Sequence, residues 1–115
     1  MALDKEKIRH IHDFKINHIF IEEWNDEISV KSMSAKDRID FETLQKNSDL
    51  SEIDILVSFL IYTCCDHNGN KLFDNSDEDK ALLKDKSMDA LVRVFKSALE
   101  LNSLTKNDIE EQAKN

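Results

Sequence analysis

The residues best suited to chemistry lie in the short polar segment 66–70, which has the sequence DHNGN. Its side chains Asp66, Asn68 and Asn70 have the spacing of the first three oxygen ligands of a calcium-binding loop. Such a loop also needs a glycine at its sixth position and a glutamate at its twelfth, where this chain has a lysine and an aspartate. We therefore expect a turn and not a calcium site, with Asn68 and Gly69 in the positive-φ backbone of a type I′ turn.

Histidine and cysteine side chains are the other candidate metal ligands or nucleophiles. Zinc needs three or four converging ligands, whereas the four histidines are scattered along the chain, at His10, His12, His18 and His67. Cys64 and Cys65 are adjacent within an apolar run, so we predict buried, reduced thiols. The chain also lacks a G-x-S-x-G elbow and a glycine-rich phosphate loop. The sequence therefore predicts no enzyme and no metal or other cofactor.

The acidic composition argues against nucleic acid and membrane surfaces as ligands. The 115 residues include 24 Asp and Glu against 16 Lys and Arg, and the formal net charge is -8. Phosphate backbones and anionic lipids are bound by clustered cations, and none cluster here. The start of the chain has no apolar signal segment, and the longest apolar run, at 55–65, is far shorter than the ~20 residues that span a bilayer. We expect a cytoplasmic protein.

Residues 13–32 have the alternation of a β-hairpin. After a flexible polar arm at 1–12, apolar and polar residues alternate with a period of two on both sides of a polar break at 22–27. Trp24 lies in this break, at or near the turn of the predicted hairpin. It either folds back over the hairpin or anchors a partner from an exposed turn.

Helical signals dominate the rest of the chain. Helices are predicted from Ser34 to about residue 47, where Ile39, Phe41 and Leu44 supply an apolar side, and then over 53–62, 79–84, 87–102 and 105–112. The sequence therefore predicts one α+β domain over 13–115, mainly α-helical, with an N-terminal β-hairpin followed by four or five helices.

Two helix ends carry more specific expectations. Residues 62–65 suit helix or strand, and we expect an extended segment near Cys64 that pairs with 71–73 as a short hairpin. Asn102 suits a left-handed end for the long helix at 87–102.

Five motifs follow one another in a characteristic order between residues 13 and 115. They are a tryptophan turn with a strand and a Ser-Ala-x-Asp-Arg helix opening at 23–38, a D-x-x-G-x-x-L-F turn at 66–73, an acidic helix start at 77–79, an A-x-E-L-N-x-L-T helix closing at 98–105 and an acidic tail at 108–115. This ordered set resembles the tail assembly chaperones of long-tailed, siphovirus-like phages and prophages. Relatives often have glycine at the position of Ser103, and the arm at 1–12 matches none of the motifs.

The resemblance implies a protein that works in the host cytoplasm and is absent from the mature virion. It would bind the tape measure protein, keep that long chain soluble and promote assembly of the tail tube. In many relatives a translational frameshift yields a longer form that contacts the major tail protein, and residues 113–115 are compatible with such a junction. Relatives also form rings or filaments, so self-association is a further expectation.

A chaperone of this kind needs exposed apolar side chains on a well-charged protein. The candidates are Phe20 and Trp24 in the hairpin, and Leu72 and Phe73 after the turn, although for Leu72 and Phe73 a place in the core is the stronger expectation. The alternative function is a non-catalytic acidic cytoplasmic adaptor or regulatory protein-binding module. A metal-dependent protein that uses the histidines or the Asp66 turn is a further rival, and thermal melts with and without calcium and zinc would test it.

Overall fold

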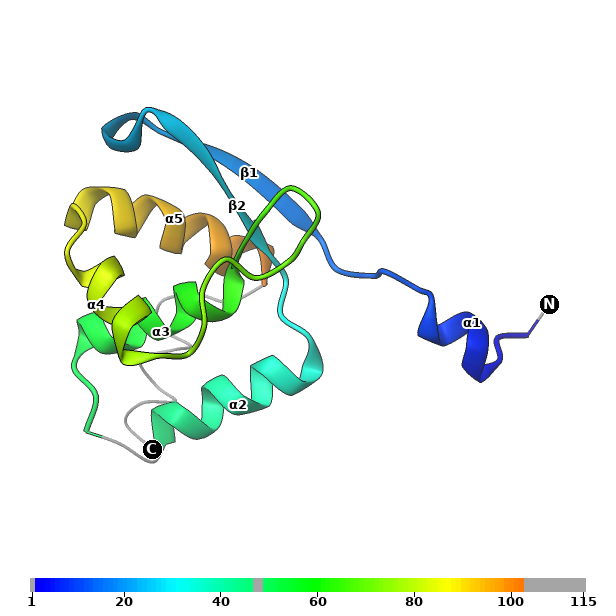
Figure 1. Cartoon of the computed structure of the whole chain (residues 1–115). Helices are drawn as coiled ribbons and strands as arrows, with labels where there is room; N and C mark the ends of the chain where they lie inside the picture. Colours follow the sequence, from blue (N-terminus) through cyan, green and yellow to red (C-terminus); the bar gives the residue numbers. More distant parts are fainter. Residues whose placement is uncertain (1, 47–48, 103–115) are drawn as a thin grey trace.

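A three-stranded antiparallel sheet packed against helices forms the described part of the chain, residues 2–46 and 49–102 of the computed structural model (Figure 1). The predicted α+β, mainly helical fold with an N-terminal hairpin is confirmed. No helix among these residues is long and apolar enough to cross a membrane. The elements in chain order are α1 (Lys5–Arg9), β1 (Ile16–Ile21), the 3-10 turn η1 (Glu22–Trp24), β2 (Asp26–Lys31), α2 (Ala35–Lys46), α3 (Glu52–Thr63), β3 (Cys64–Cys65), α4 (Asp77–Lys84) and α5 (Met88–Leu101).

The predicted hairpin consists of β1 and β2, which pair antiparallel from Ile16 opposite Lys31 to Ile21 opposite Asp26. Successive side chains of a strand point to opposite faces, so the hairpin has two distinct faces. The inner face packs on α5, which lies along the hairpin in Figure 1. Its residues are Asn17, Ile19, Ile21, Ile28 and Val30, and those of the outer face are Ile16, His18, Phe20, Ser29 and Lys31.

Helix α3 runs into β3 without a loop, so the chain is helical to Thr63 and extended at Cys64 and Cys65. β3 pairs with β2 and completes the sheet in the order β1-β2-β3. The predicted pairing of 62–65 with 71–73 is present as one antiparallel bridge, between Cys65 and Lys71, while the pairing of β3 with β2 is a contact that the sequence does not predict. Both thiols are fully buried, and a position beside the longer β2 strand buries them better than an isolated hairpin would.

The segment 66–70 is a turn, but it is not of type I′. A type I′ turn needs positive φ at both central residues, but here only Gly69 has it, with a φ of +87°. Asn25 is the one non-glycine residue with positive φ in the described ranges. Asn68 keeps negative φ, and its N–H donates to the Asp66 carboxylate at 2.8 Å. The side chain of Asp66 thus builds an Asx turn in place of the type I′ geometry.

The core lies between α3, α5 and the inner face of the hairpin. Helix α3 is apolar nearly all round, and each of its residues from Val57 to Thr63 is buried, as its composition predicts. The ring of Phe59 makes edge-to-face contacts with Phe41 of α2 at 5.2 Å and with Phe95 of α5 at 5.5 Å. These aromatic contacts join the three helices.

Serine side chains cap the first turns of α2, α3, α4 and α5. In each case the hydroxyl accepts the backbone N–H three residues later, which satisfies a donor left free by the first helical turn. At α3, the Asp54 carboxylate also accepts from the Ser51 backbone, which completes a capping box. The capping residues are Ser34, Ser51, Ser76 and Ser87.

Two details of the helices differ from the predictions. In α2, Phe41 is buried but Ile39 is 61% exposed, because residues two apart point about 200° apart on a helix and cannot share a face. At the end of α5, Asn102 has a φ of −93° and not the left-handed conformation. Its side chain accepts from the Met33 N–H at 2.7 Å and donates to the Ala98 carbonyl at 2.8 Å, which stabilises an ordinary helical end.

The polar arm contains a short helix, α1, capped by Asp4. Every residue from 2 to 13 is exposed, and α1 stands clear of the remaining elements in Figure 1. The predicted helix at 105–112, Ser103 and the acidic tail lie outside the described residues.

Candidate partner-binding surface

The tip of the hairpin is fixed to α5 by its turn. Glu23 of η1 forms a salt bridge with Arg93 of α5, and Asn25, with φ 50° and ψ 40°, lets the chain turn back into β2. Trp24 is half-buried and packs against the core. This packing agrees with the first interpretation of Trp24, whereas contact of Trp24 with a partner stays a prediction.

Phe20 lies on the outer face near this tip and is 56% exposed. Its neighbour Ile21 points the other way and is completely buried. A large exposed aromatic side chain gains little for the fold, and aromatic rings of this kind are frequent anchors in protein interfaces. Phe20 therefore satisfies the first requirement of a partner-binding residue, which is access.

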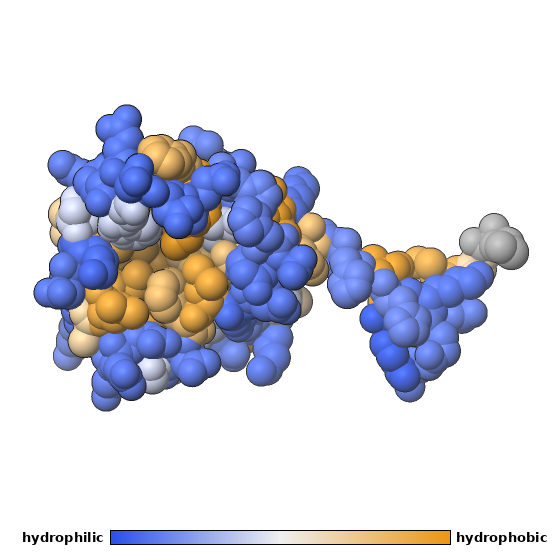
Figure 2. Space-filling view, turned by 45° about the horizontal axis from the view of Figure 1, so that its top comes forward, coloured by the Kyte–Doolittle hydropathy of each residue, from blue (hydrophilic) through white to orange (hydrophobic). Residues whose placement is uncertain are grey.

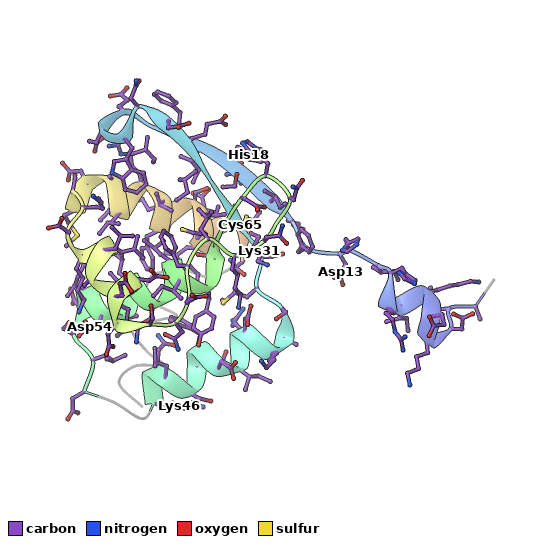
Figure 3. The ribbon with its side chains drawn as sticks, viewed as in Figure 1. Asp13, His18, Lys31, Lys46, Asp54 and Cys65 are labelled. Carbon is purple, nitrogen blue, oxygen red and sulfur yellow. The ribbon has the colours of Figure 1, made fainter. Side chains whose placement is uncertain are left out.

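The turn 66–70 covers the opposite end of the outer face. Lys31 Nζ donates to the Gly69 carbonyl at 2.8 Å, and the rings of His18 and His67 lie 5.1 Å apart. Phe14 sits so close to Gly69 that an added Cβ would lie 2.6 Å from its ring. Figure 3 shows His18, Lys31 and Cys65 around this loop. The segment is a turn, as the sequence predicts, and it covers this end of the outer face of the sheet.

Leu72 and Phe73 follow the turn and have different environments. Phe73 is half-buried and packs against the core, as expected. Leu72 is 48% exposed, so the expectation of a core position is wrong for this residue. The backbone N–H of Leu72 donates to the Cys64 carbonyl at 3.2 Å, which holds Leu72 beyond β3, at the edge of the sheet farthest from β1.

The four candidate residues therefore do not form one cluster. Phe20 and Leu72 are accessible at opposite edges of the sheet, and Trp24 and Phe73 support the surface from below. The sequence analysis missed other exposed apolar side chains, which lie on α2, α4, α5 and the arm. They are Ile39, Leu82 and Met88, and Leu3, Ile8 and Ile11. Helical spacing identifies Ile39, which falls on the face opposite Phe41, but no comparable signal marks the other residues.

Figure 2 shows the apolar residues of one face of the molecule, framed by charged residues. An orange area occupies the middle of the globular part, and blue residues surround it. On the arm, apolar residues gather along one side and charged residues along the other. An apolar area within a charged rim is the arrangement of many protein-binding surfaces.

Hydrogen bonds within the turn and burial shift the pKa values of Asp66, Cys64 and Cys65. Hydrogen bonds from the Asn70 and Asn68 backbone lower the pKa of Asp66, so the carboxylate is engaged within its own turn. Burial raises the pKa of the Cys64 thiol far above its usual range and also raises the pKa of Cys65. Both cysteines are free and buried, as predicted, and a neutral buried thiol is a poor nucleophile.

Metal ligands do not converge in the described ranges. No group of three or more His, Cys, Asp or Glu residues there could hold an ion. His10 and His12 are exposed on the arm. The Nδ1 atom of His18 lies 2.6 Å from Ser29 Oγ, and the His18 ring also contacts that of His67.

Comparison with known proteins shows a likeness of the fold as a whole. No family model matches the sequence, and no curated protein matches it. A solved structure described as that of the bacteriophage HK97 tail assembly chaperone matches with a TM-score of 0.61 and 17% identity, over 84% of this chain and 90% of that one. The two proteins therefore share a fold. The matching protein is described as a chaperone and not as an enzyme.

Proposed function

We propose that this chain is a phage tail assembly chaperone that binds the tape measure protein, keeps it soluble and promotes assembly of the tail tube. The observation that carries the proposal is the likeness to the HK97 chaperone over most of both chains. The ordered motifs at 23–38, 66–73 and 77–79 lie within the described elements and point to the same family. The proposed role requires no catalysis and no cofactor, and it places the protein in the host cytoplasm and outside the mature virion.

The chemistry of the surface supports this role. A protein that holds a long, aggregation-prone chain in solution needs apolar contacts for that chain and enough charge to keep the complex dissolved. Phe20 and Leu72 supply accessible apolar contacts at the two edges of the sheet. The net charge of -8 supplies the solubility. Contacts at both edges suit a partner that is long enough to extend across the sheet.

Co-expression with the tape measure protein of the same phage tests the proposal. We expect the unchanged chain to raise the soluble fraction of the tape measure protein and to co-purify with it. The double variant Phe20→Ser with Leu72→Ser should lose most of this effect, because both contacts become polar. The matched control is Ile39→Ser with Leu82→Ser, which changes two side chains of similar exposure on α2 and α4.

Different outcomes separate the alternatives. No gain in solubility and no co-purification with the unchanged chain would favour the acidic adaptor or regulatory module. Equal loss in both double variants would move the contact surface away from Phe20 and Leu72. A frameshifted longer form that contacts the major tail protein is a separate expectation, and the reading frames around codons 112 to 115 would test it.

A further inference from the structure

The turn 66–70 contains an Asn-Gly pair, Asn68 and Gly69, and Gly69 is the one glycine of the chain. Asparagine is a thermolabile residue, and it reacts most readily when glycine follows, because glycine has no side chain to block the approach to its backbone nitrogen. Asn68 is exposed, and its side-chain amide has no hydrogen-bond partner in the described part of the chain. The Asn70 side chain differs, because it donates to the Asp66 carboxylate at 3.3 Å and is followed by a lysine. Asn68 is therefore the asparagine of this turn that is open to reaction.

We propose that Asn68 converts spontaneously to aspartate and isoaspartate, and that the isoaspartate form releases the turn from the outer face of the sheet. Water is the only co-reactant. Conversion adds a negative charge at position 68, so the converted fraction of a sample rises with its age. The proposal is independent of the proposed function.

The reaction proceeds through a cyclic imide. The Gly69 backbone N–H gives its proton to hydroxide, the nitrogen forms a bond to Cγ of Asn68, the bond from Cγ to Nδ2 breaks, and ammonia leaves. Water then opens the ring. Attack at Cγ restores the main chain and gives aspartate, whereas attack at the backbone carbonyl carbon of position 68 leaves the chain joined through Cγ, as isoaspartate. In sum, one water is consumed and one ammonia is released, with no change of oxidation state.

The folded turn slows the first step. The Gly69 N–H donates to the Asp66 carbonyl at 3.1 Å, and Gly69 is buried. Its nitrogen is therefore withheld from Asn68 until the turn opens locally, and such opening is a normal property of surface segments. The rate of conversion then follows the opening of the turn. An unstructured peptide of the same sequence lacks this protection and should react faster.

The isoaspartate form cannot keep the packing of the turn. Its main chain runs through Cβ and Cγ, which places one extra carbon atom between the α-carbon of position 68 and Gly69. There is no room for a longer chain, since even an added Cβ on Gly69 would lie 2.6 Å from the Phe14 ring and 3.4 Å from Ile16. The hydrogen bond from Lys31 Nζ to the Gly69 carbonyl is displaced as well. Loss of these contacts uncovers Phe14 and Ile16, whereas the aspartate product keeps the original main chain.

Incubation of the full chain at mildly alkaline pH tests the site. Peptide mapping by mass spectrometry locates the exchange of an amide for a carboxyl group, and protein isoaspartyl methyltransferase labels isoaspartate. We expect conversion at Asn68 to be at least about tenfold faster than at Asn70, the matched control in the same turn, and to be absent at this position in Asn68→Ser. A synthetic peptide of residues 64–72 should convert faster than the folded chain. Equal rates at the two asparagines, a peptide no faster than the chain, or an unconverted chain after the peptide has fully reacted would overturn the proposal.

The single glycine gives a direct readout of the turn. Glycine enriched in the heavy nitrogen isotope yields one backbone amide signal in NMR, that of Gly69. We expect the isoaspartate fraction to lose the native signal and to melt at a lower temperature, whereas Asn68→Asp, with the same charge on an unchanged main chain, should keep the signal near its native position. Fluorescence of Trp24, the single tryptophan, should stay unchanged and verify that the rest of the fold is intact. An isoaspartate fraction with the native signal and melting temperature would refute the release of the turn.

Discussion

The two faces of strand β1 have similar apolar content but opposite roles. On β1, Ile19 and Ile21 of the inner face pack into the core, and Ile21 is completely buried. On the outer face, Phe20 is 56% exposed, and the turn 66–70 covers only the far end. The fold therefore uses Ile19 and Ile21 of the strand, and Phe20 between them is available for contacts with other molecules. The hydrophobicity of the residues alone does not distinguish the inner face of β1 from its outer face.

The largest expected effect separates the two faces directly. Ile21→Ala should lower the free energy of unfolding by about 3 kcal/mol, because it removes buried apolar surface and leaves a cavity. Phe20→Ala, one residue away, should change it by no more than about 0.5 kcal/mol, as is usual for exposed positions. Urea denaturation of both variants measures the difference. Similar losses in the two variants would contradict the assignment of the faces.

The covered end of the outer face should respond to a change in the turn. Gly69→Ala should cost about 2 kcal/mol, since alanine is strained at positive φ and its Cβ meets the Phe14 ring. Asn68→Ala is the control, because Asn68 has negative φ and contributes its backbone N–H to the Asp66 carboxylate. We expect this control to stay within about 0.5 kcal/mol of the unchanged chain in thermal melts.

A polar contact of the inner face should have a smaller effect. Asn17 Nδ2 donates to Ser97 Oγ of α5 at 2.8 Å, at an exposed site. Asn17→Ala should therefore cost about 0.5 to 1 kcal/mol. A double-mutant cycle with Ser97→Ala isolates the interaction, and a coupling energy near zero would mean that the bond does not stabilise the packing of β1 on α5.

The smallest effect concerns the tip and depends on pH. The Arg93 guanidinium holds the pKa of Glu23 below its ordinary value of 4.5. A carboxyl group with a lowered pKa in the folded state stabilises the fold fully above its unfolded pKa, and this contribution is lost as the pH falls through the folded pKa. Glu23→Gln should therefore be slightly less stable than the unchanged chain near pH 7, and the two should converge as the pH falls below the lowered pKa that Glu23 has in the folded state. A gap that persists at low pH would assign the effect to packing.

Much of the fold follows from local signals in the sequence. The alternation in 13–32 predicts the hairpin, and the serines before α3, α4 and α5 predict their starts, because capping depends on residues three positions apart. Contacts between segments far apart in the sequence are harder to predict. The sequence around Cys64 predicts an extended segment, but only the packing of α3 determines that β3 pairs with β2. Asn102 likewise forms bonds to a distant segment, which overrides its local preference.

The candidate surface is predictable to a smaller extent. The position of Phe73 in the core and the inward fold of Trp24 are consistent with the sequence-based expectations. Exposure of Leu72 depends on the path of the chain after the turn, which no local pattern encodes. The spacing of Ile39 and Phe41 does predict that only one of the two side chains is buried, since an α-helix cannot bury two residues that lie two positions apart on a narrow contact face.

The direct passage from α3 into β3 constrains how the chain can vary. Because no loop separates the two elements, the rotation of α3 about its axis and the register of β3 on β2 change together. One inserted residue before Cys64 would rotate the strand by about 100° relative to the helix and exchange the faces of Cys64 and Cys65. At this junction, side chains of similar size can therefore be exchanged far more readily than the length of the chain can be altered.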